Sequence, residues 1–383
     1  MLKLVEKNLI IGVDRELIAG RRQQGHLGPV VGADRRCGMR SETLPLLSRV
    51  ADSVYWIGRY IERAENVARF IGVNLNLQID LPLAPAHQWQ PLIDTSGDTE
   101  VFREKYGVAT QARVIAYLAY DSDNSNSIAS CLRFARENAR SVRETISSEM
   151  WAQVNSMYLQ LQSQRSLPEP ERMLDAFRDI RMGCHLFQGV TDATMSHNEA
   201  YHFLRLGRKL ERADKTSRIL DVKYFMLLPS TSDVGTPYDD IHWTAVLKSV
   251  SGFEMYRKKF GHITPSDVVD FLVMDADFPR AVHYCISRAS ESLHAITGTP
   301  LSTFRYTSEQ LMGQLRAELD YTSVQSVIRR GLHEYLDGLQ AKMNAIDQSL
   351  RDDFAVTVPQ ITTQTSTEPT SQSQSQSSKQ SSV

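Results

Sequence analysis

The feature that most constrains this chain is an internal repeat. One charged motif occurs twice, first as Gly58-Arg59-x-x-Glu62-Arg63-Ala64-Glu65-x-x-x-Arg69 and then as Gly207-Arg208-x-x-Glu211-Arg212-Ala213-Asp214-x-x-x-Arg218. Three further blocks match in the same order: residues 102–107 with 256–261, 121–137 with 275–291, and 180–187 with 328–335. The offset stays between 148 and 154 residues across all four blocks. Since chance does not easily keep four blocks collinear, the repeat predicts two copies of one unit of about 150 residues.

The spacing of the apolar residues predicts helices within each copy. Between residues 50 and 75 they recur three and four apart, at Val50, Val54, Ile57, Ile61, Ala64, Ala68, Ile71 and Leu75. This pattern is one apolar stripe on a helix of about eight turns. Strand-type alternation is scarce, and prolines fall between the periodic segments. We therefore predict an all-α helical bundle of two tandemly duplicated units, with four or five helices each, packed about a pseudo-two-fold axis.

The two ends of the chain differ from the part between them. Residues 20–40 are rich in Gly, Arg and Gln with little periodicity, so residues 1–40 are predicted to be a disordered N-terminal extension, with Met39 an alternative start. The Ser-, Thr- and Gln-rich residues 356–383 are predicted to be a disordered tail. Residues 41–355 are predicted to form the helical domain, with the first repeat at about 46–190 and the second at about 191–350.

The composition argues against several classes of protein. A net charge of -2 and a pI near 6.6 give no basic face for nucleic acid and no reason to expect a membrane-surface partner. No apolar run reaches the ~18 residues of a transmembrane helix, so we expect a cytoplasmic protein. The four cysteines fit no zinc pattern and are expected to be reduced and buried. Because the chain has no Gly-rich phosphate loop, G-x-S-x-G or H-E-x-x-H motif, a self-contained hydrolase or kinase is not expected, and no cofactor is evident.

The repeated charged motif is the main candidate for a functional site. In each copy its charged side chains lie at the edge of the buried stripe: Arg59, Glu62, Arg63, Glu65 and Arg69, then Arg208, Glu211, Arg212, Asp214 and Arg218. The i,i+4 spacing predicts ion pairs of Glu65 with Arg69 and of Asp214 with Arg218. Glycine within a helix costs about 1 kcal/mol relative to alanine. Gly58 and Gly207 therefore predict the close approach of another helix or a ligand.

Two interpretations of these charges are open. In the first interpretation, they form a salt-bridge network between helices, where arginine suits partly buried carboxylates. Alternatively, they line a polar cleft in which the arginines bind a carboxylate or phosphate and the glutamates bind an amine or a metal.

Other polar residues are weaker candidates. Asp121 and Asp123, like Asp275 and Asp277, precede helices predicted to begin near Ser125 and Pro279, so helix capping is favoured over a metal site. The equivalent His185 and His333 are expected more often to be structural than to bind a ligand. The polar stretch 189–195, which includes Thr191 and Asp192, is expected to connect the units and is a further candidate for lining a site.

The longest motifs carry a family resemblance. Residues 47–66 (LSRVADSVYWIGRYIERAEN), 203–224 and 331–336 closely resemble the bacterial alpha-E domain family, over about Leu46 to Leu350. Members of that family are encoded beside, or fused to, circularly permuted ATP-grasp proteins that resemble amide-bond-forming ligases, often with a transglutaminase-like peptidase nearby. No catalytic residues are firmly assigned to the family, so none is carried over. This chain keeps the signature Glu and Arg positions in both copies.

The resemblance implies an accessory or co-catalytic partner of an ATP-grasp amidoligase in a peptide or amide-bond synthesis or modification system. Such a partner would bind the ligase or present a peptide or amino-acid substrate to it. One alternative is an enzyme in its own right that uses a Glu/Arg-lined helical cleft, with or without a metal, although the signature helices lack the Glu-x-x-His pairs of di-iron bundles. Another is a structural scaffold whose charged edge only locks the two units together.

Overall fold

The computed structural model describes residues 46, 48–80, 85–163, 169–227 and 237–354, and every regular element in these ranges is helical. The all-α prediction is confirmed, whereas the predicted N-terminal extension and tail lie outside the described residues. The first part of the chain forms α1 (Ser48–Asp80), α2 (Pro85–Ser96), α3 (Thr99–Tyr106), α4 (Gln111–Ile115), α5 (Ile128–Ser141), α6 (Ser148–Ser163) and α7 (Pro170–Thr194). The second part forms α8 (Glu199–Leu227), α9 (Pro237–Ser249), α10 (Phe253–Phe260), α11 (Pro265–Val269), α12 (Val282–Thr297), α13 (Thr307–Tyr321), α14 (Val324–Arg330) and α15 (Leu332–Phe354).

The prediction of four or five helices in each unit is too low, because short helices turn the chain between the long ones. Within the described ranges, seven α-helices precede residue 195 and eight follow it, of which five in each part have twelve residues or more. The five-residue helices α4 and α11 each continue into a π-helical turn, η1 (Ala116–Tyr120) and η2 (Asp270–Met274). A π-turn is a rare element, so its presence at the same place in both parts is a close match in local structure.

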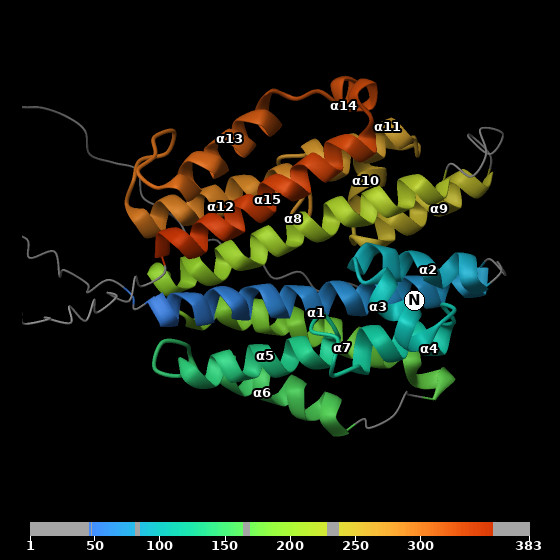
Figure 1. Cartoon of the computed structure of the whole chain (residues 1–383), viewed down its shortest axis with the longest axis horizontal. Coiled ribbons are helices and arrows are strands. Elements are labelled where there is room, and N and C mark those ends of the chain that lie inside the picture. Colours follow the sequence, from blue (N-terminus) through green and yellow to red (C-terminus); the bar gives the residue numbers. More distant parts are fainter. Residues whose placement is uncertain (1–45, 47, 81–84, 164–168, 228–236, 355–383) are drawn as a thin grey trace, which may run out of the picture. The chain divides into compact units, whose positions relative to one another are not determined.

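Two long helices, α1 and α8, lie side by side in the middle of the described part (Figure 1). Helices α5 and α7 pack against α1, and α6 packs on both of them. Helices α12 and α15 pack against α8, and α13 packs on both of them. The charged motifs lie on α1 and α8, so they face the centre of the arrangement.

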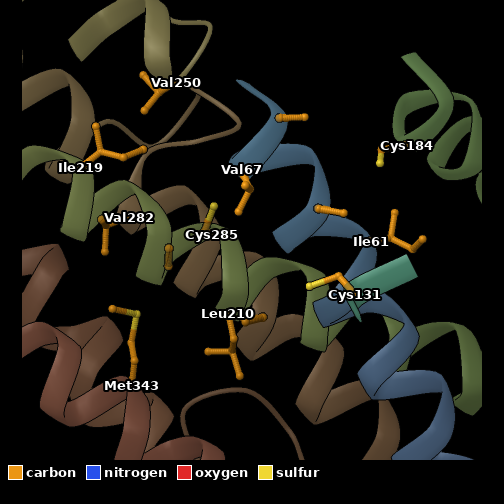
Figure 2. Packing of buried hydrophobic residues seen from close by; sticks show 14 of the residues in the cluster. Ile61, Val67, Cys131, Cys184, Leu210, Ile219, Val250, Val282, Cys285 and Met343 are labelled. Carbon is orange, nitrogen blue, oxygen red and sulfur yellow. The ribbon is translucent and has the colours of Figure 1, made fainter. Parts of the chain in front are cut away.

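The apolar stripe predicted for the first motif forms the buried face of α1. All eight of its residues have exposed fractions of 8% or less, and so do Leu206, Leu210, Ala213 and Leu220 on α8. Figure 2 shows side chains of this core. It includes Cys131, Cys184 and Cys285, which are free and buried as predicted, whereas Cys37 lies outside the described residues.

The glycines of the motif bring the backbones of α1 and α8 into direct contact. A Cβ atom added at Gly58 would lie 2.3 Å from the carbonyl oxygen of Leu204 on α8. A Cβ atom added at Gly207 would lie 2.3 Å from the carbonyl oxygen of Tyr55 on α1. No side chain fits at these distances. The sequence predicted the close approach of a helix or a ligand, and it is a helix that approaches.

Three local predictions are corrected by the structure. Residues 189–194 continue α7, so Thr191 and Asp192 lie on a helix, and the connection to α8 is only residues 195–198. Helices α5 and α12 begin at Ile128 and Val282, about three residues later than predicted.

The acidic pairs before α5 and α12 do not cap these helices. The cap of α5 is the Ser127 hydroxyl, which accepts from the Ser130 N–H. Instead, Asp121 and Asp275 accept the N–H of the residue two positions on and the ammonium of Lys105 or Lys259. They stabilise turns before the helices, because an aspartate carboxylate bonds readily to the backbone two residues ahead.

No helix in the described ranges is long and apolar enough to cross a membrane.

Candidate functional site

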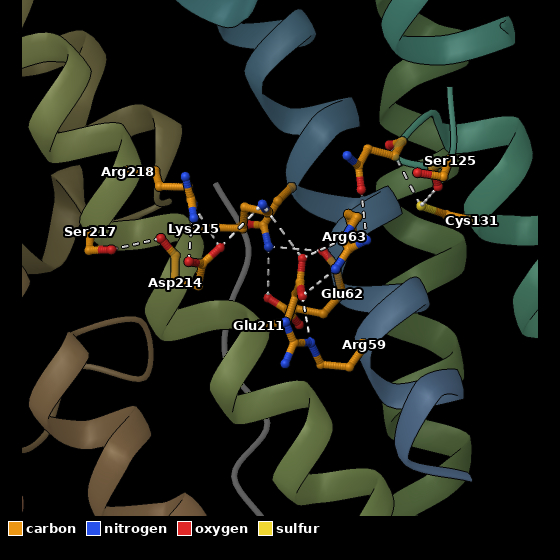
Figure 3. Close-up of polar contacts among 12 residues, drawn as sticks. Arg59, Glu62, Arg63, Ser125, Cys131, Glu211, Asp214, Lys215, Ser217 and Arg218 are labelled. Carbon is orange, nitrogen blue, oxygen red and sulfur yellow. Dashed lines mark hydrogen bonds and ion pairs between the residues drawn. The ribbon is translucent and has the colours of Figure 1, made fainter. Parts of the chain in front are cut away.

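The glutamates of the two motifs pair with arginines across the contact between α1 and α8, which we call the seam. Glu211 on α8 accepts from Arg63 Nε at 2.7 Å and Nη2 at 2.9 Å, and from Arg59 Nε at 2.6 Å (Figure 3). Glu62 on α1 accepts from Arg212 Nε and Nη2, both at 2.7 Å. Both carboxylates are fully buried. These forked contacts are the geometry that arginine and carboxylate favour.

Both seam glutamates are ionised. Burial raises the pKa of Glu62, but the charges of Arg212 and Arg280 outweigh it and hold the pKa well below its usual range. Burial likewise raises the pKa of Glu211, and Arg63 and Arg59 reverse the effect. Because removal of one partner would leave an uncompensated buried charge, each pair ties the two helices together.

Around Glu211, every cation forms an ion pair with an acidic side chain. Arg59 also donates to Asp347 Oδ1 at 2.8 Å, and Asp347 accepts from the Tyr55 hydroxyl as well. Lys215 lies 3.3 Å from Asp214 Oδ2 and 3.8 Å from Glu211 Oε1. Arg218 Nε lies 3.0 Å from both oxygens of Asp214, which is the i,i+4 pair that the sequence predicted. We call this set the balanced half of the seam.

Around Glu62 and Glu65, not every cation forms a close ion pair, and we call this set the cationic half. Arg280 donates to Glu62 Oε1 at 3.2 Å and to Glu65 Oε2 at 2.9 Å. Arg69 forms the predicted ion pair with Glu65. Two further cations on α8 are buried here. The first, Arg208, has one acid within ion-pair distance in the described ranges, the half-exposed Asp192 at 3.9 Å. The second, Lys209, lies 4.7 Å from the centre of the Tyr284 ring and forms no ion pair within the described residues.

The pKa values express this surplus of positive charge. Burial lowers the pKa of Arg69 to about 8, helped by the charges of Arg280 and Arg181. Burial, with Arg212 beside it, lowers the pKa of Lys209 to about 7 and that of Arg280 to about 10. Since a guanidinium keeps its proton in proteins, these values mark buried charges that have too few anions around them.

The remaining candidates are divided between the seam and its surroundings. His185 on α7 points its Nε2 at Glu65 Oε1, 3.5 Å away, and burial next to Arg69 lowers its pKa to about 4. His333 Nδ1 lies 2.7 Å from Asp221 Oδ1 on a more exposed surface. The hydroxyl of Thr191 donates to the Phe187 carbonyl of its own helix, as a structural group would. Asp192 accepts from the Tyr201 hydroxyl at 3.1 Å.

Several residues of the site were not predicted from the sequence. The most important is Arg280, which joins Glu62 to Glu65, and Lys215 is another. A signal was present in the repeat. When the two parts of the sequence are aligned on their matching blocks, Asn126 falls at the position of Arg280, and Asn66 falls at the position of Lys215. These aligned positions, where one part of the sequence has a cation and the other an amide, mark the difference between the two halves of the seam.

The site offers no cluster of metal ligands in the part of the chain that the structure describes. No group of three or more His, Cys, Asp or Glu side chains there is placed to hold a metal ion.

The fold and the site define an all-α protein built around two helices that buried arginine–carboxylate pairs hold together. The Alpha-E family model, described as a predicted alpha-helical domain with a conserved ER motif, matches residues 46–354, and the chain belongs to this family. Glu62-Arg63 and Glu211-Arg212 are Glu-Arg pairs at the centres of α1 and α8.

Similar proteins include an uncharacterised protein of Mycobacterium bovis and uncharacterised proteins of two strains of Mycobacterium tuberculosis. Each is 22% identical over 334 residues, and the match covers 79% of this chain and 36% of the relative. The chain thus spans about a third of the length of the curated relatives it matches. No solved structure matches it.

Proposed function

We propose that this chain is an accessory or co-catalytic partner of an ATP-grasp amidoligase in a peptide or amide-bond synthesis or modification system. It binds the ligase, or presents a peptide or amino-acid substrate to it, in the cytoplasm where ATP is supplied. The observation that carries the proposal is that the signature charges pair with each other. Glu62 and Glu211 are fully buried, and each accepts hydrogen bonds from an arginine of the opposite helix. Charges used in this way build a rigid scaffold rather than an open pair of acid and base.

Two further observations support a role beside another protein. The family resemblance implies ATP-grasp proteins as neighbours. The curated relatives carry about twice as much additional sequence as the part that matches this chain, which fits a domain that works next to others.

We also propose that the two parts are duplicated units related by a pseudo-two-fold axis that passes between α1 and α8. The support is reciprocity. Gly58 meets Leu204 while Gly207 meets Tyr55, and each residue of the second contact lies 149 positions from its counterpart in the first. Arg63 with Glu211 and Arg212 with Glu62 repeat the pattern. Contacts that exchange partners in this manner are what a two-fold axis produces.

The partnership is tested by purifying the tagged chain from its own cells and identifying what accompanies it by mass spectrometry. We expect an ATP-grasp protein in near-equal amount, and we expect the purified chain to raise ATP consumption by that ligase when its substrate is present. A solitary protein, or a ligase whose activity ignores the chain, would contradict the proposal.

A scaffold-only role is the second candidate, and the full burial of Glu62 and Glu211 favours it. It predicts that Glu62→Gln and Glu211→Gln lower the melting temperature but leave ligase stimulation, per folded molecule, unchanged. The accessory role in which these charges form the polar site predicts that stimulation falls as well. An enzyme acting alone would show turnover without the ligase, and metal analysis with chelator treatment tests whether a metal takes part.

A further inference from the structure

A polar pocket lies beside the cationic half of the seam, between α1, α7 and α9. Its volume is about 560 Å³, a size typical of small-molecule sites. Two cations line it, Arg181 from α7 and Lys248 from α9. Ser251, in the turn between α9 and α10, and Asn76 and Thr244 add groups that can form hydrogen bonds. None of these residues belongs to the predicted site.

The cations of this pocket lack anionic partners. Among the described residues, neither Arg181 nor Lys248 forms an ion pair, and the buried Nε of Arg181 has no hydrogen-bond partner. The carboxylate of Glu254 also lines the pocket and, like Lys248, is exposed, but among the described residues it pairs with neither cation. A buried guanidinium N–H with no acceptor costs free energy that an anionic ligand would recover.

A third cation lies behind the pocket wall. Arg69 is only 2% exposed, and one of its Nη atoms donates to the hydroxyl of Ser251, which lines the pocket. Its Nε is buried and has no hydrogen-bond partner among the residues that the structure describes. The seam therefore reaches the pocket through Arg69 and Ser251, and its surplus positive charge extends to the pocket wall.

The other half of the described part differs at two of these cations. Arg218, the counterpart of Arg69, is held by both oxygens of Asp214. Asp94 stands 154 positions before Lys248, and its carboxylate accepts from Gln90 and Thr99. The same scaffold thus places an acid in one half where it places a cation in the other. A difference of this kind is expected of a site that serves only one half.

We propose that this pocket binds the carboxylate or phosphate group of a small molecule. Arg181 and Lys248 contact the anion directly, Ser251 donates or accepts a hydrogen bond, and Arg69 adds positive charge from behind. The apolar side chains of Val73, Leu77 and Ile241 line the same pocket and accommodate an aliphatic part of the ligand. The inference goes beyond the proposed partnership, because it concerns binding by this chain alone.

The test is isothermal titration calorimetry of the full chain at low salt, with inorganic phosphate and glutarate as separate probes and the neutral glutaramide as a control. We expect saturable binding of at least one anion and none of glutaramide. Arg181→Gln and Lys248→Gln should each weaken binding about tenfold or more, as the loss of a charge-assisted hydrogen bond does. Arg178→Gln is the matched control, because it removes the same charge one turn away on α7. Arg178 is largely exposed and pairs with Asp175 at 3.0 Å, and its variant should bind within about twofold of the wild type.

Each outcome decides the inference. Saturable binding of phosphate alone assigns a phosphate-bearing ligand, and binding of glutarate assigns a carboxylate. The absence of saturable binding for both anions overturns the proposal, and so does an Arg181→Gln variant that binds as tightly as the wild type. Melting temperatures of the variants, recorded alongside, separate lost binding from lost folding. An unsuccessful search for a ligase partner would leave these results unaffected.

Discussion

The two halves of the seam start from the same motif and end with different charge balances. In the balanced half, every cation forms an ion pair with one of three acids, Glu211, Asp214 or Asp347. The cationic half has an additional arginine, Arg280, and the neutral Asn66 at the position of Lys215. Of its buried cations, Arg208 lies 3.9 Å from an acid, and Lys209 forms no ion pair within the described residues. The reciprocal pairs of Glu62 and Glu211 provide the structural lock in both halves. Only the cationic half retains charge that a ligand could neutralise, so the difference separates scaffold from candidate binding site.

The largest effect expected is from removing one seam carboxylate. Breaking a buried ion pair from one side costs about 3–5 kcal/mol, so Glu62→Gln and Glu211→Gln should each destabilise the protein by that order in urea unfolding. Among the described residues, each loss leaves one arginine without an acid, Arg212 in the first variant and Arg63 in the second. Glu62→Gln should cost more, because Glu62 also offsets the buried charges of Arg208 and Lys209.

Glu137→Gln serves as the control, since Glu137 pairs with arginines at an exposed site and should change stability by about 0.5 kcal/mol or less. Equal costs for Glu62→Gln and Glu211→Gln would show that the two halves are electrostatically alike.

Overpacking the seam comes next in size. A methyl group at Gly58 or Gly207 would collide with a carbonyl oxygen of the opposite helix. We expect Gly58→Ala and Gly207→Ala each to lower the free energy of unfolding by about 2–3 kcal/mol, in the range of overpacked cores. At Gly72 on α1, an added Cβ atom would meet nothing within 4 Å among the described residues, so Gly72→Ala should stabilise by roughly 0.5–1 kcal/mol. If the two seam variants are as stable as Gly72→Ala, the direct contact of α1 and α8 is wrong.

The sequence predicts those parts of this seam that depend on local periodicity. The apolar stripe of α1, the Glu65–Arg69 and Asp214–Arg218 pairs and the close approach at Gly58 all follow from residues three or four apart or from one glycine. The partners of Glu62 and Glu211 do not, because each arginine lies about 150 residues away and its choice depends on how the two helices pack.

The pocket could not be predicted from the sequence for the same reason, because it depends on how distant helices pack. Arg181 lies on α7, whereas Lys248 and Ser251 lie at the end of α9 and in the turn after it. No spacing in the sequence relates Arg181 to the other two. The acidic turns were misassigned as caps because Asp serves both roles, and only the position of Lys105 or Lys259 distinguishes them.

Removing the charge of Lys209 tests directly whether the cationic half carries surplus positive charge. Its folded-state pKa of about 7 lies below its ordinary value, because of burial and then Arg212. Between about pH 7 and pH 10 the unfolded chain therefore binds more protons at this lysine than the folded one, and stability rises with pH in that window. Lys209→Met should stabilise the protein by roughly 1–2 kcal/mol at pH 7, as when an unpaired buried charge gives way to an apolar side chain, and should flatten the rise.

The measurement is urea unfolding at pH 7 and again near pH 9.5. Arg69 adds no slope in this window, because its guanidinium keeps its proton in both the folded and the unfolded chain. The counterpart of Lys209 in the balanced half is Tyr60, and Tyr60→Phe should leave the pH dependence in this window as it is in the wild type. A Lys209→Met variant with the full wild-type slope would remove Lys209 from the surplus.

The smallest effect concerns the link between seam and pocket. Ser251 has a φ of 51°, a left-handed conformation that costs a residue with a side chain about 1 kcal/mol relative to glycine. The turn between α2 and α3 has Gly97 with a φ of 81° at the corresponding place, so glycine suffices for the turn itself. The hydroxyl that accepts from Arg69 is what Ser251 adds.

Ser302 has a φ of 69° and offers a matched control away from the seam. Ser302→Gly should stabilise by about 1 kcal/mol through relief of strain alone. Ser251→Gly should gain less, because it also removes the acceptor of a buried guanidinium. Ser251→Ala keeps the strain and loses the bond, so it should be about 1 kcal/mol less stable than Ser251→Gly. If Ser251→Gly stabilises as much as Ser302→Gly, the bond from Arg69 adds nothing to the folded state. The cationic half would then end at Arg69, and the charge in the pocket would come from Arg181 and Lys248 alone.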